Sequence, residues 1–242
     1  MTLLIPPRDG IDIGDYSLRD FAAKWLMQQC DLAQTDVYRA ANATVRASRD
    51  DRRRIVFMGD SITEFWNGLA GFESAATLVL NRGIRGQNSS QMLLRFQDDA
   101  ISLQPALIVL LCGTNDLRSY VGEAASVGEG AMERIRRNVA SMVDIASSHG
   151  VKMTLCSLPP VNPRHPVHRD PQWIQRINAA LAALASKRSL EFVDYHGAMV
   201  DGQGCLPGEY SEDGVHPNAP GYARMQEALE AALSRMGFSS PS

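Results

Sequence analysis

Ser61 occupies a position in the sequence where a serine could act as a nucleophile. A short apolar run ends at Gly59, and a helix could begin at Ser61 itself. The N-terminus of a helix offers unpaired backbone N–H groups and positive potential, which would stabilise an oxyanion next to the serine. The Ser-x-x-Glu spacing to Glu64 is also typical of a capping box, in which Ser61 would only cap the helix. Thr63 replaces the second glycine of a Gly-x-Ser-x-Gly elbow, so that motif is excluded.

His216 is the first candidate for the general base that such a serine needs. It stands in the run from Ser211 to Pro217, where Gly214 permits a tight turn and Pro217 disfavours helix at the histidine. Across that turn, Asp213 could accept the Nδ1–H of His216 and leave Nε2 free to take the serine proton. An ordinary surface turn is the alternative, because Asp-Gly is common in turns.

Other histidines offer competing interpretations. His196 follows Asp194 at the end of a predicted strand and is a second candidate base. His149 precedes Gly150 at a predicted helix C-terminus, where a histidine interacts favourably with the helix dipole. A weak metal-binding pattern lies in a proline-bounded loop and comprises His165, His168 and Asp170.

Two further loops could supply donors to an oxyanion. Gly86 belongs to a glycine-containing loop after the second predicted strand, where a backbone N–H could approach a substrate closely. Asn115 follows the third predicted strand, and its side-chain amide could donate to the same oxygen. Each residue alone is also an ordinary loop residue.

Predicted strands alternate with predicted helices after residue 53, which indicates an α/β fold with a parallel sheet. The expected strands are Ile55–Met58, Thr77–Asn81, Leu107–Cys112, Lys152–Ser157 and Glu191–Asp194. The expected helices are Ser89–Leu103, Glu129–Ser148, Gln172–Lys187 and Pro220–Met236. A doubly wound, flavodoxin-like sheet of order 2-1-3-4-5 would collect the candidate residues at the carboxyl edge of its strands.

Composition and charge narrow the functional classes. The 242 residues carry a net charge of −3, which gives no electrostatic basis for binding nucleic acid. No apolar stretch is long enough to span a membrane, and the N-terminus lacks signal-peptide features, so a cytoplasmic location is expected. Helical periodicity from about Tyr16 to Ala47 predicts an N-terminal helical extension over residues 1–50 that packs on the main domain. Cys112 and Cys156 are expected in the core.

Four blocks in a fixed order resemble the SGNH, or GDSL-type, hydrolase family. They are Gly59–Thr63, Asn81–Gly86, Gly113–Asp116 and Asp213–Pro217, with isoleucine at residue 62 in place of the leucine of the family name. The resemblance spans about Ile55 to Leu233 and is strongest to bacterial acylhydrolases similar to platelet-activating-factor acetylhydrolase or lysophospholipase. It implies a three-layer α/β/α fold, with the hydrolase domain at residues 51–242.

The resemblance also implies ester hydrolysis through an acyl-serine, without a metal or an organic cofactor. The expected catalytic residues are Ser61, Asp213 and His216, and the expected oxyanion hole is formed by Ser61, Gly86 and Asn115. Substrate contacts are expected from Asp60, Arg118, Leu158, Pro159 and Val215. The loop Leu158–Pro171, together with Arg118 and Tyr120, would border the pocket.

Polar walls of this kind favour a small acyl group on a polar alcohol, such as an acetylated sugar. A lysophospholipase and an acyl-CoA thioesterase are alternatives within the hydrolases. A non-catalytic carbohydrate- or lipid-binding domain and a metal-dependent hydrolase are alternatives outside them. The expected partner is a small-molecule ester, and the sequence does not determine the oligomeric state.

Overall fold

Five parallel strands form the centre of the computed structural model, which describes residues 30–118, 126–163 and 169–238. Their bounds are β1 Arg53–Gly59, β2 Thr77–Gly83, β3 Leu107–Leu110, β4 Lys152–Cys156 and β5 Glu191–Val193. The strand order is β2-β1-β3-β4-β5, and every neighbouring pair is parallel. The predicted fold class and strand order are therefore confirmed.

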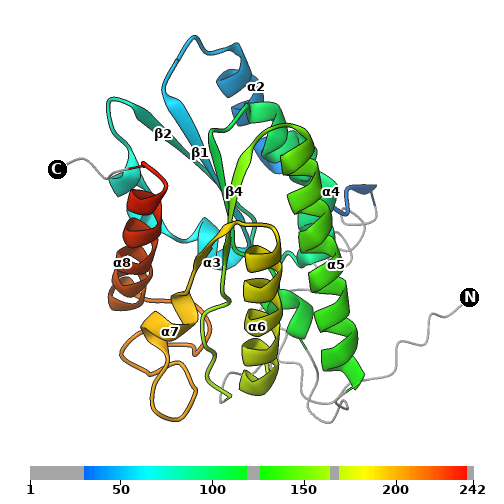
Figure 1. Ribbon diagram of the computed structural model, residues 1–242, viewed down its shortest axis with the longest axis vertical. Helices are drawn as coiled ribbons and strands as arrows, with labels where there is room; N and C mark the ends of the chain where they lie inside the picture. The colour runs from blue at the N-terminus through cyan, green and yellow to red at the C-terminus, as the bar shows by residue number, and fades with distance from the viewer. Residues whose placement is uncertain (1–29, 119–125, 164–168, 239–242) are drawn as a thin grey trace, which may run out of the picture.

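Helices cover both faces of this sheet (Figure 1). Three long helices, α4 Ser89–Asp99, α5 Ser126–Ser148 and α6 Pro171–Lys187, pack side by side on one face. The helix α8 Ala219–Arg235 lies on the other face and contacts α7 Tyr195–Met199 and β5. No helix among the described residues is both long and apolar enough to cross a membrane.

The burial of β1 and β3 explains why the sequence forms a sheet covered on both sides. Residues 55–58 of β1 and all four residues of β3 are buried, as expected for central parallel strands with helices on both faces. Cys112 and Cys156 are buried in the same core, as predicted. Three of the helices begin at side-chain caps, since Asn88, Asp170 and Asn218 each accept a backbone N–H at the start of α4, α6 and α8.

Several short elements lie between the strands and the long helices. The helix α3 Ser61–Glu64 begins at Ser61, as the sequence predicted, whereas α7 and the 3-10 helices Asn67–Phe72 and Thr114–Leu117 were not predicted; the last of these we call η3, and a further 3-10 helix spans Ile101–Leu103. One or two turns of helix carry too few residues for an apolar period to be recognised. The predicted helix Ser89–Leu103 ends at Asp99, and its last three residues form the 3-10 helix Ile101–Leu103.

The predicted N-terminal helix is only partly within the described residues. Residues 16–29 lie outside them, and residues 31–35 form a turn, so a continuous helix to Ala47 is wrong. Asp31 accepts hydrogen bonds from the Thr35 hydroxyl and the Asp36 N–H, which closes this turn, and Gln34 has a φ of 56°. The helix α2 Asp36–Ala47 follows and packs against α4. The division at residue 50 stays a prediction.

Candidate active site

The carboxyl ends of the strands bring the predicted residues to one edge of the sheet (Figure 1). Ser61 begins α3 directly after β1, and the tight packing of α3 depends on two glycines. A Cβ on Gly59 would lie 2.0 Å from Thr63 Oγ1, and one on Gly83 would lie 2.2 Å from the Glu64 nitrogen. Because neither position has room for a side chain, α3 is held directly against the ends of β1 and β2.

Ser61 and His216 are in hydrogen-bond contact despite their distance in the sequence. Ser61 Oγ lies 2.8 Å from His216 Nε2, and the Ser61 residue is only 7% exposed. The capping role considered for Ser61 belongs to its neighbour, since the Asp60 carboxylate accepts the Ile62 N–H at 3.0 Å. Glu64 does not complete a capping box and instead binds Arg85. The capping interpretation of Ser61 is therefore wrong, and its hydroxyl is free to interact with the imidazole.

Asp213 holds the imidazole of His216 from the other side. Asp213 Oδ2 lies 2.5 Å from His216 Nδ1, while Oδ1 accepts the backbone N–H of Val215 and His216. Gly214 has a φ of 82°, which favours glycine and lets the chain turn between the two side chains. This arrangement places the Nδ1 proton toward the carboxylate and leaves Nε2 to accept a proton from Ser61.

The Asp213 carboxyl is tuned to remain ionised. Partial burial raises its pKa, but the hydrogen bonds from the ring and backbone of His216 and from Val215 outweigh burial. The resulting pKa lies well below the usual range of an aspartate. A carboxylate in this state stabilises the imidazolium that would form when His216 takes a proton.

Three candidate donors follow the carboxyl ends of β1, β2 and β3, namely the backbone N–H groups of Ser61 and Gly86 and the side-chain amide of Asn115. Within the described residues, the backbone N–H groups of Ser61 and Gly86 donate to no protein acceptor. The Asn115 amide donates to the Gln87 carbonyl at 3.0 Å and, more loosely, to Asp60 Oδ2 at 3.3 Å. Arg169 donates to Asn115 Oδ1 at 3.2 Å, which keeps the NH₂ of Asn115 directed toward the side of Asp60. The set has the chemistry of an oxyanion hole.

Asp60 is an ionisable group in the middle of this set. The residue is 1% exposed, and its burial raises the pKa of its carboxyl to about 6. The hydrogen bond from Ile62 and the positive charge of Arg169 oppose this shift. Burial therefore favours the protonated form of Asp60, which competes less strongly for the Asn115 amide than the carboxylate does.

Comparison with known proteins agrees with this geometry. Residues 57–224, more than half of the chain, match the model of the GDSL-like Lipase/Acylhydrolase family. The chain belongs to this family. It is also similar to a solved GDSL-like lipase from Bacteroides thetaiotaomicron VPI-5482, with 35% identity, a TM-score of 0.72, and coverage of 84% of this chain and 98% of that one. The protein is thus a hydrolase of the esterase and acylhydrolase class.

Two curated relatives are more distant. Esterase TesA of Pseudomonas aeruginosa is 27% identical over 156 residues, which are 64% of this chain and 69% of that protein. An acetylxylan esterase of Xylanibacter ruminicola is 24% identical over 221 residues, covering 78% of this chain but only 45% of that protein. This GDSL hydrolase therefore spans less than half the length of the second relative.

The predicted substrate-binding residues of this hydrolase divide into two groups. Arg118 presents an exposed side chain at the end of η3. The other four are buried, namely Asp60, Leu158, Pro159 and Val215. Leu158 and Val215 are in the apolar core, so their side chains support the loops around the site and present almost no surface to a ligand.

The competing histidines lie elsewhere in the described structure. His196 lies in α7, where its backbone N–H donates to Ser157 Oγ, and desolvation lowers the pKa of its ring. His149 follows the end of α5, and its Nδ1 lies 2.9 Å from the Ile145 carbonyl, as expected for a helix C-terminus. The metal-site histidines, His165 and His168, lie outside the described residues. Within the described ranges no group of three potential metal ligands exists.

A buried polar network behind the loop of Gly86 was missed by the sequence reading. Arg95 is fully buried and donates to the Gln87 side chain, to Asp99 and to the Gly59 carbonyl. Asp99 also accepts the side-chain amide of Asn42, at 2.6 Å, from α2. Gln87 is in turn the residue whose carbonyl binds the Asn115 amide. The network therefore connects the loop of Gly86 and Asn115, which we call the oxyanion side, to α4 and to α2 in the N-terminal segment.

The sequence did contain one signal for this network. Met92, Arg95, Phe96 and Asp99 share one face of α4, at the spacing of an apolar stripe. An arginine and an aspartate one turn apart within such a stripe indicate a buried ion pair. Arg169 had no such signal, because it lies in a loop without a periodic pattern.

Proposed function

We propose that the protein is a serine carboxylester hydrolase in which Ser61 is the nucleophile and His216 the general base. The observation that carries this proposal is the chain of contacts from Ser61 Oγ through the His216 ring to Asp213, at 2.8 Å and 2.5 Å. A serine in contact with an oriented imidazole, together with backbone N–H groups that donate to no acceptor within the described ranges, has the parts that acyl transfer requires.

The reaction proceeds in two similar halves. His216 Nε2 takes the proton of Ser61 Oγ while the oxygen attacks the ester carbonyl, and the resulting oxyanion accepts hydrogen bonds from Ser61 N–H, Gly86 N–H and the Asn115 amide. Collapse breaks the bond to the alcohol, which leaves with the proton from His216. Water then attacks the acyl-serine with the same proton transfers, releasing the acid and restoring Ser61.

The substrate in this proposal is an ester of a short acyl group with a polar alcohol. An acetylated carbohydrate is one such ester, and the partial likeness to an acetylxylan esterase is in line with it. Lysophospholipase and acyl-CoA thioesterase activities would require a longer acyl group or a larger leaving group. The cytoplasmic location stays a prediction.

The deciding experiment is hydrolysis of p-nitrophenyl acetate by the wild type and by Ser61→Ala, with circular dichroism to verify folding. We expect a loss of about 10⁴-fold or more in the variant, because the acyl-serine cannot form. Equal activity of the two proteins would refute the role of Ser61. Inactivity of both, extended to other esters, would favour the non-catalytic binding domain. A series of acyl lengths then separates short-chain esterase from lysophospholipase.

A further inference from the structure

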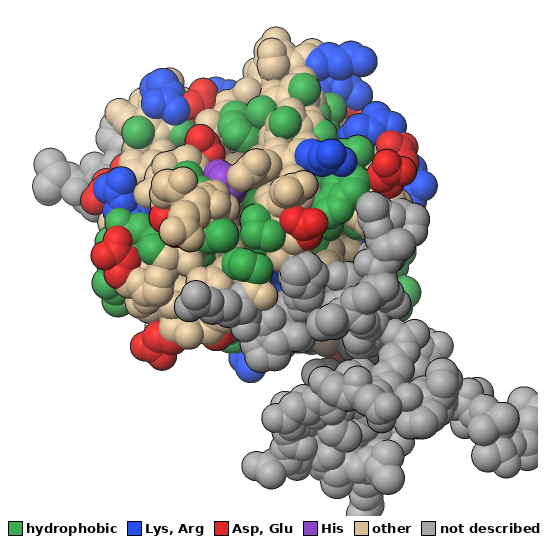
Figure 2. All heavy atoms as spheres, turned by 90° about the horizontal axis from the view of Figure 1, so that it is seen from below, with side chains coloured by type: hydrophobic (Ala, Val, Ile, Leu, Met, Phe, Trp, Pro, Cys, Tyr) green, Lys and Arg blue, Asp and Glu red, His purple; other side chains and the backbone are tan. Residues whose placement is uncertain are grey.

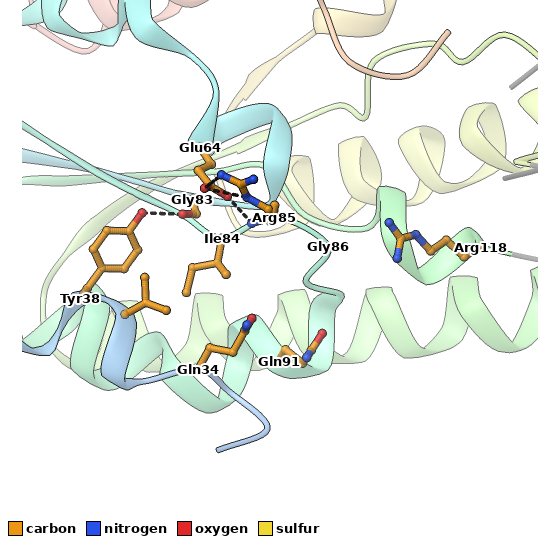
Figure 3. Close-up of a pocket in the computed structure, with 10 residues that line it drawn as sticks. Gln34, Tyr38, Glu64, Gly83, Ile84, Arg85, Gly86, Gln91 and Arg118 are labelled. Atoms are coloured by element: carbon orange, nitrogen blue, oxygen red, sulfur yellow. Dashed lines mark hydrogen bonds and ion pairs between the residues drawn. The ribbon is translucent and has the colours of Figure 1, made fainter. Parts of the chain in front are cut away.

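A cavity of about 350 Å³ opens beside the oxyanion side of the site. Its walls include Gly86, Arg118 and the Glu64–Arg85 pair on one side and three residues of the N-terminal segment, Gln34, Val37 and Tyr38, on the other (Figure 3). Neither Ser61 nor His216 lines it. The cavity is therefore adjacent to the proposed reaction centre and separate from it.

The position of the cavity relative to the proposed base indicates which part of a substrate it would receive. The leaving alcohol takes its proton from His216, so it must lie on the His216 side of the carbonyl. The acyl group extends away from the leaving group, and the carbonyl oxygen faces Gly86. A cavity that is lined by Gly86 but by no residue of the Asp213–Pro217 loop thus lies where the acyl group would extend.

The polar groups of the cavity are mainly donors. The Glu64 carboxylate is occupied by the backbone and guanidinium of Arg85, and the Tyr38 hydroxyl donates to the Gly83 carbonyl. Gln34 accepts a hydrogen bond from Gln87 through Oε1, which leaves its NH₂ as the available end.

Arg118 supplies the remaining charge. Its guanidinium forms no hydrogen bond or ion pair with the part of the chain that the structure describes. Figure 3 shows Gln34 and Arg118 on opposite sides of the loop of Gly86, with both side chains directed toward it. A positive charge and an amide NH₂ that both line the cavity favour a ligand group that only accepts hydrogen bonds, such as a carboxylate.

The N-terminal wall of the cavity lies outside the part of the chain that matches the family, which begins at residue 57. This wall is fixed in place by contacts with the domain, since Tyr38 binds the Gly83 carbonyl and Asn42 binds Asp99. Val37 is 56% exposed and lies at the start of α2. The segment is thus positioned to add a specificity element to the common site.

We propose that this cavity binds the far end of the acyl group and selects short acyl groups that end in a carboxylate, with Arg118 as the charged contact and the start of α2 as the opposite wall. This selectivity rests on the proposed esterase function and names its acyl substrate class.

The test uses two esters of equal chain length and the same small alcohol, monomethyl succinate and methyl butyrate, with acid release followed in a pH-stat. The wild type should prefer the succinate ester in kcat/KM. Arg118→Glu should lower the ratio of succinate to butyrate activity by about tenfold or more, since a charged hydrogen bond is replaced by repulsion. Arg137→Glu, on the exposed face of α5, is the matched charge control and should leave the ratio unchanged.

A second pair of variants tests the N-terminal wall. Val37→Glu places a negative charge at the cavity and should lower the ratio of succinate to butyrate activity by about fivefold. Val37→Gln introduces an uncharged side chain of the same shape as glutamate and should leave that ratio unchanged. Glutamate is tolerated in the first turn of a helix, so α2 should remain folded. An equal effect of both Val37 variants would overturn the proposed role of this wall.

Binding measurements distinguish failure of the selectivity from failure of the esterase function. Calorimetric titration of the Ser61→Ala variant with monomethyl succinate should show binding. The double variant that also carries Arg118→Glu should not bind this ester, and the Ser61→Ala variant should bind methyl butyrate more weakly. If the wild type hydrolyses neither ester but this binding is observed, the cavity assignment holds and the esterase function fails. If hydrolysis occurs without preference, or if no Arg118-dependent binding is found, the proposed selectivity is wrong.

Discussion

The two sides of the reacting serine are built in opposite ways. On the base side, the side chains of His216 and Asp213 are 34% and 44% exposed, and the two residues lie only three positions apart in one turn. On the oxyanion side, Asp60, Asn115 and Arg169 are nearly completely buried and come from three separate loops. The proposed proton carrier thus stands on a small local turn, whereas the oxyanion side is held by contacts across the domain.

This difference suggests a division between activity and stability. The side chains of Asp213 and His216 are both partly exposed, so changes to these two side chains should affect chemistry and leave the fold intact. The oxyanion side shares Gln87 with the buried ion pair of Arg95 and Asp99, so changes there should affect both. Preorganised donors in a dry site require this kind of rigid support.

Asp213→Asn should have the largest effect on activity. The asparagine keeps the size of the side chain but stabilises the wrong tautomer of His216, so we expect kcat to fall by about 10⁴-fold. Because the pair is partly exposed, Tm should change by no more than about 3 °C. Steady-state kinetics and thermal unfolding measure the two effects, and Glu212→Gln at the neighbouring exposed acid is the control. A large loss of Tm would show that the Asp213–His216 turn also supports the fold, against the proposed difference between the two sides.

Asp99→Ala should give the largest loss of stability. Arg95 and Asp99 are both fully buried, so the variant leaves an unpaired charge inside the protein and should be destabilised by about 3–5 kcal/mol. For a chain of this size the Tm should fall by roughly 10 °C. Asp144→Ala breaks the exposed pair with Arg188 and should change stability by at most about 1 kcal/mol. Equal Tm values for Asp99→Ala and Asp144→Ala would show that the buried network does not stabilise the fold.

Asn115→Ala should lower both the activity and the stability, whereas Asp213→Asn should lower mainly the activity. Loss of one oxyanion donor is expected to lower kcat by about 10²–10³-fold. The variant also leaves the buried Gln87 carbonyl without its partner, at a further loss of about 1–3 kcal/mol of stability. Asn67→Ala, at an exposed asparagine, is the control for both measurements. Full activity in Asn115→Ala would remove it from the mechanism.

The same contrast explains what the sequence could reveal. Asp213, Gly214 and His216 lie within four consecutive residues, so their geometry follows from local turn chemistry. The sheet follows from alternating apolar strands and helices. The support of Asn115 depends on Asn42 and Asp99, which are 57 positions apart and meet only in the folded chain. A single sequence does not show which helix faces meet. Asp60 was expected to contact the substrate, but in the described structure its carboxylate caps α3 and accepts a hydrogen bond from Asn115.

The signs of two pKa shifts give a last, smaller test of the comparison. Asp60 has its folded pKa raised to about 6, above the ordinary value of 3.8, so folding favours its protonated form. Its contribution to stability therefore falls as the pH rises from about 4 to above 6. Asp213 has a lowered folded pKa, so its contribution is present above the ordinary value and is lost as the pH falls. The two aspartates beside one serine should thus respond to pH in opposite directions.

Asp60→Asn isolates the first of these responses. Asparagine still caps α3 at Ile62 but does not titrate, so the variant should gain about 2 kcal/mol in free energy of unfolding relative to the wild type between pH 4 and pH 7. Urea unfolding of both proteins across that range measures the difference, with Asp144→Asn at an exposed site as the control. Asp213→Asn should instead lose stability relative to the wild type as the pH rises. A pH-independent offset for Asp60→Asn would mean that its carboxyl titrates normally, and the oxyanion side would then be as accessible to solvent as the base side.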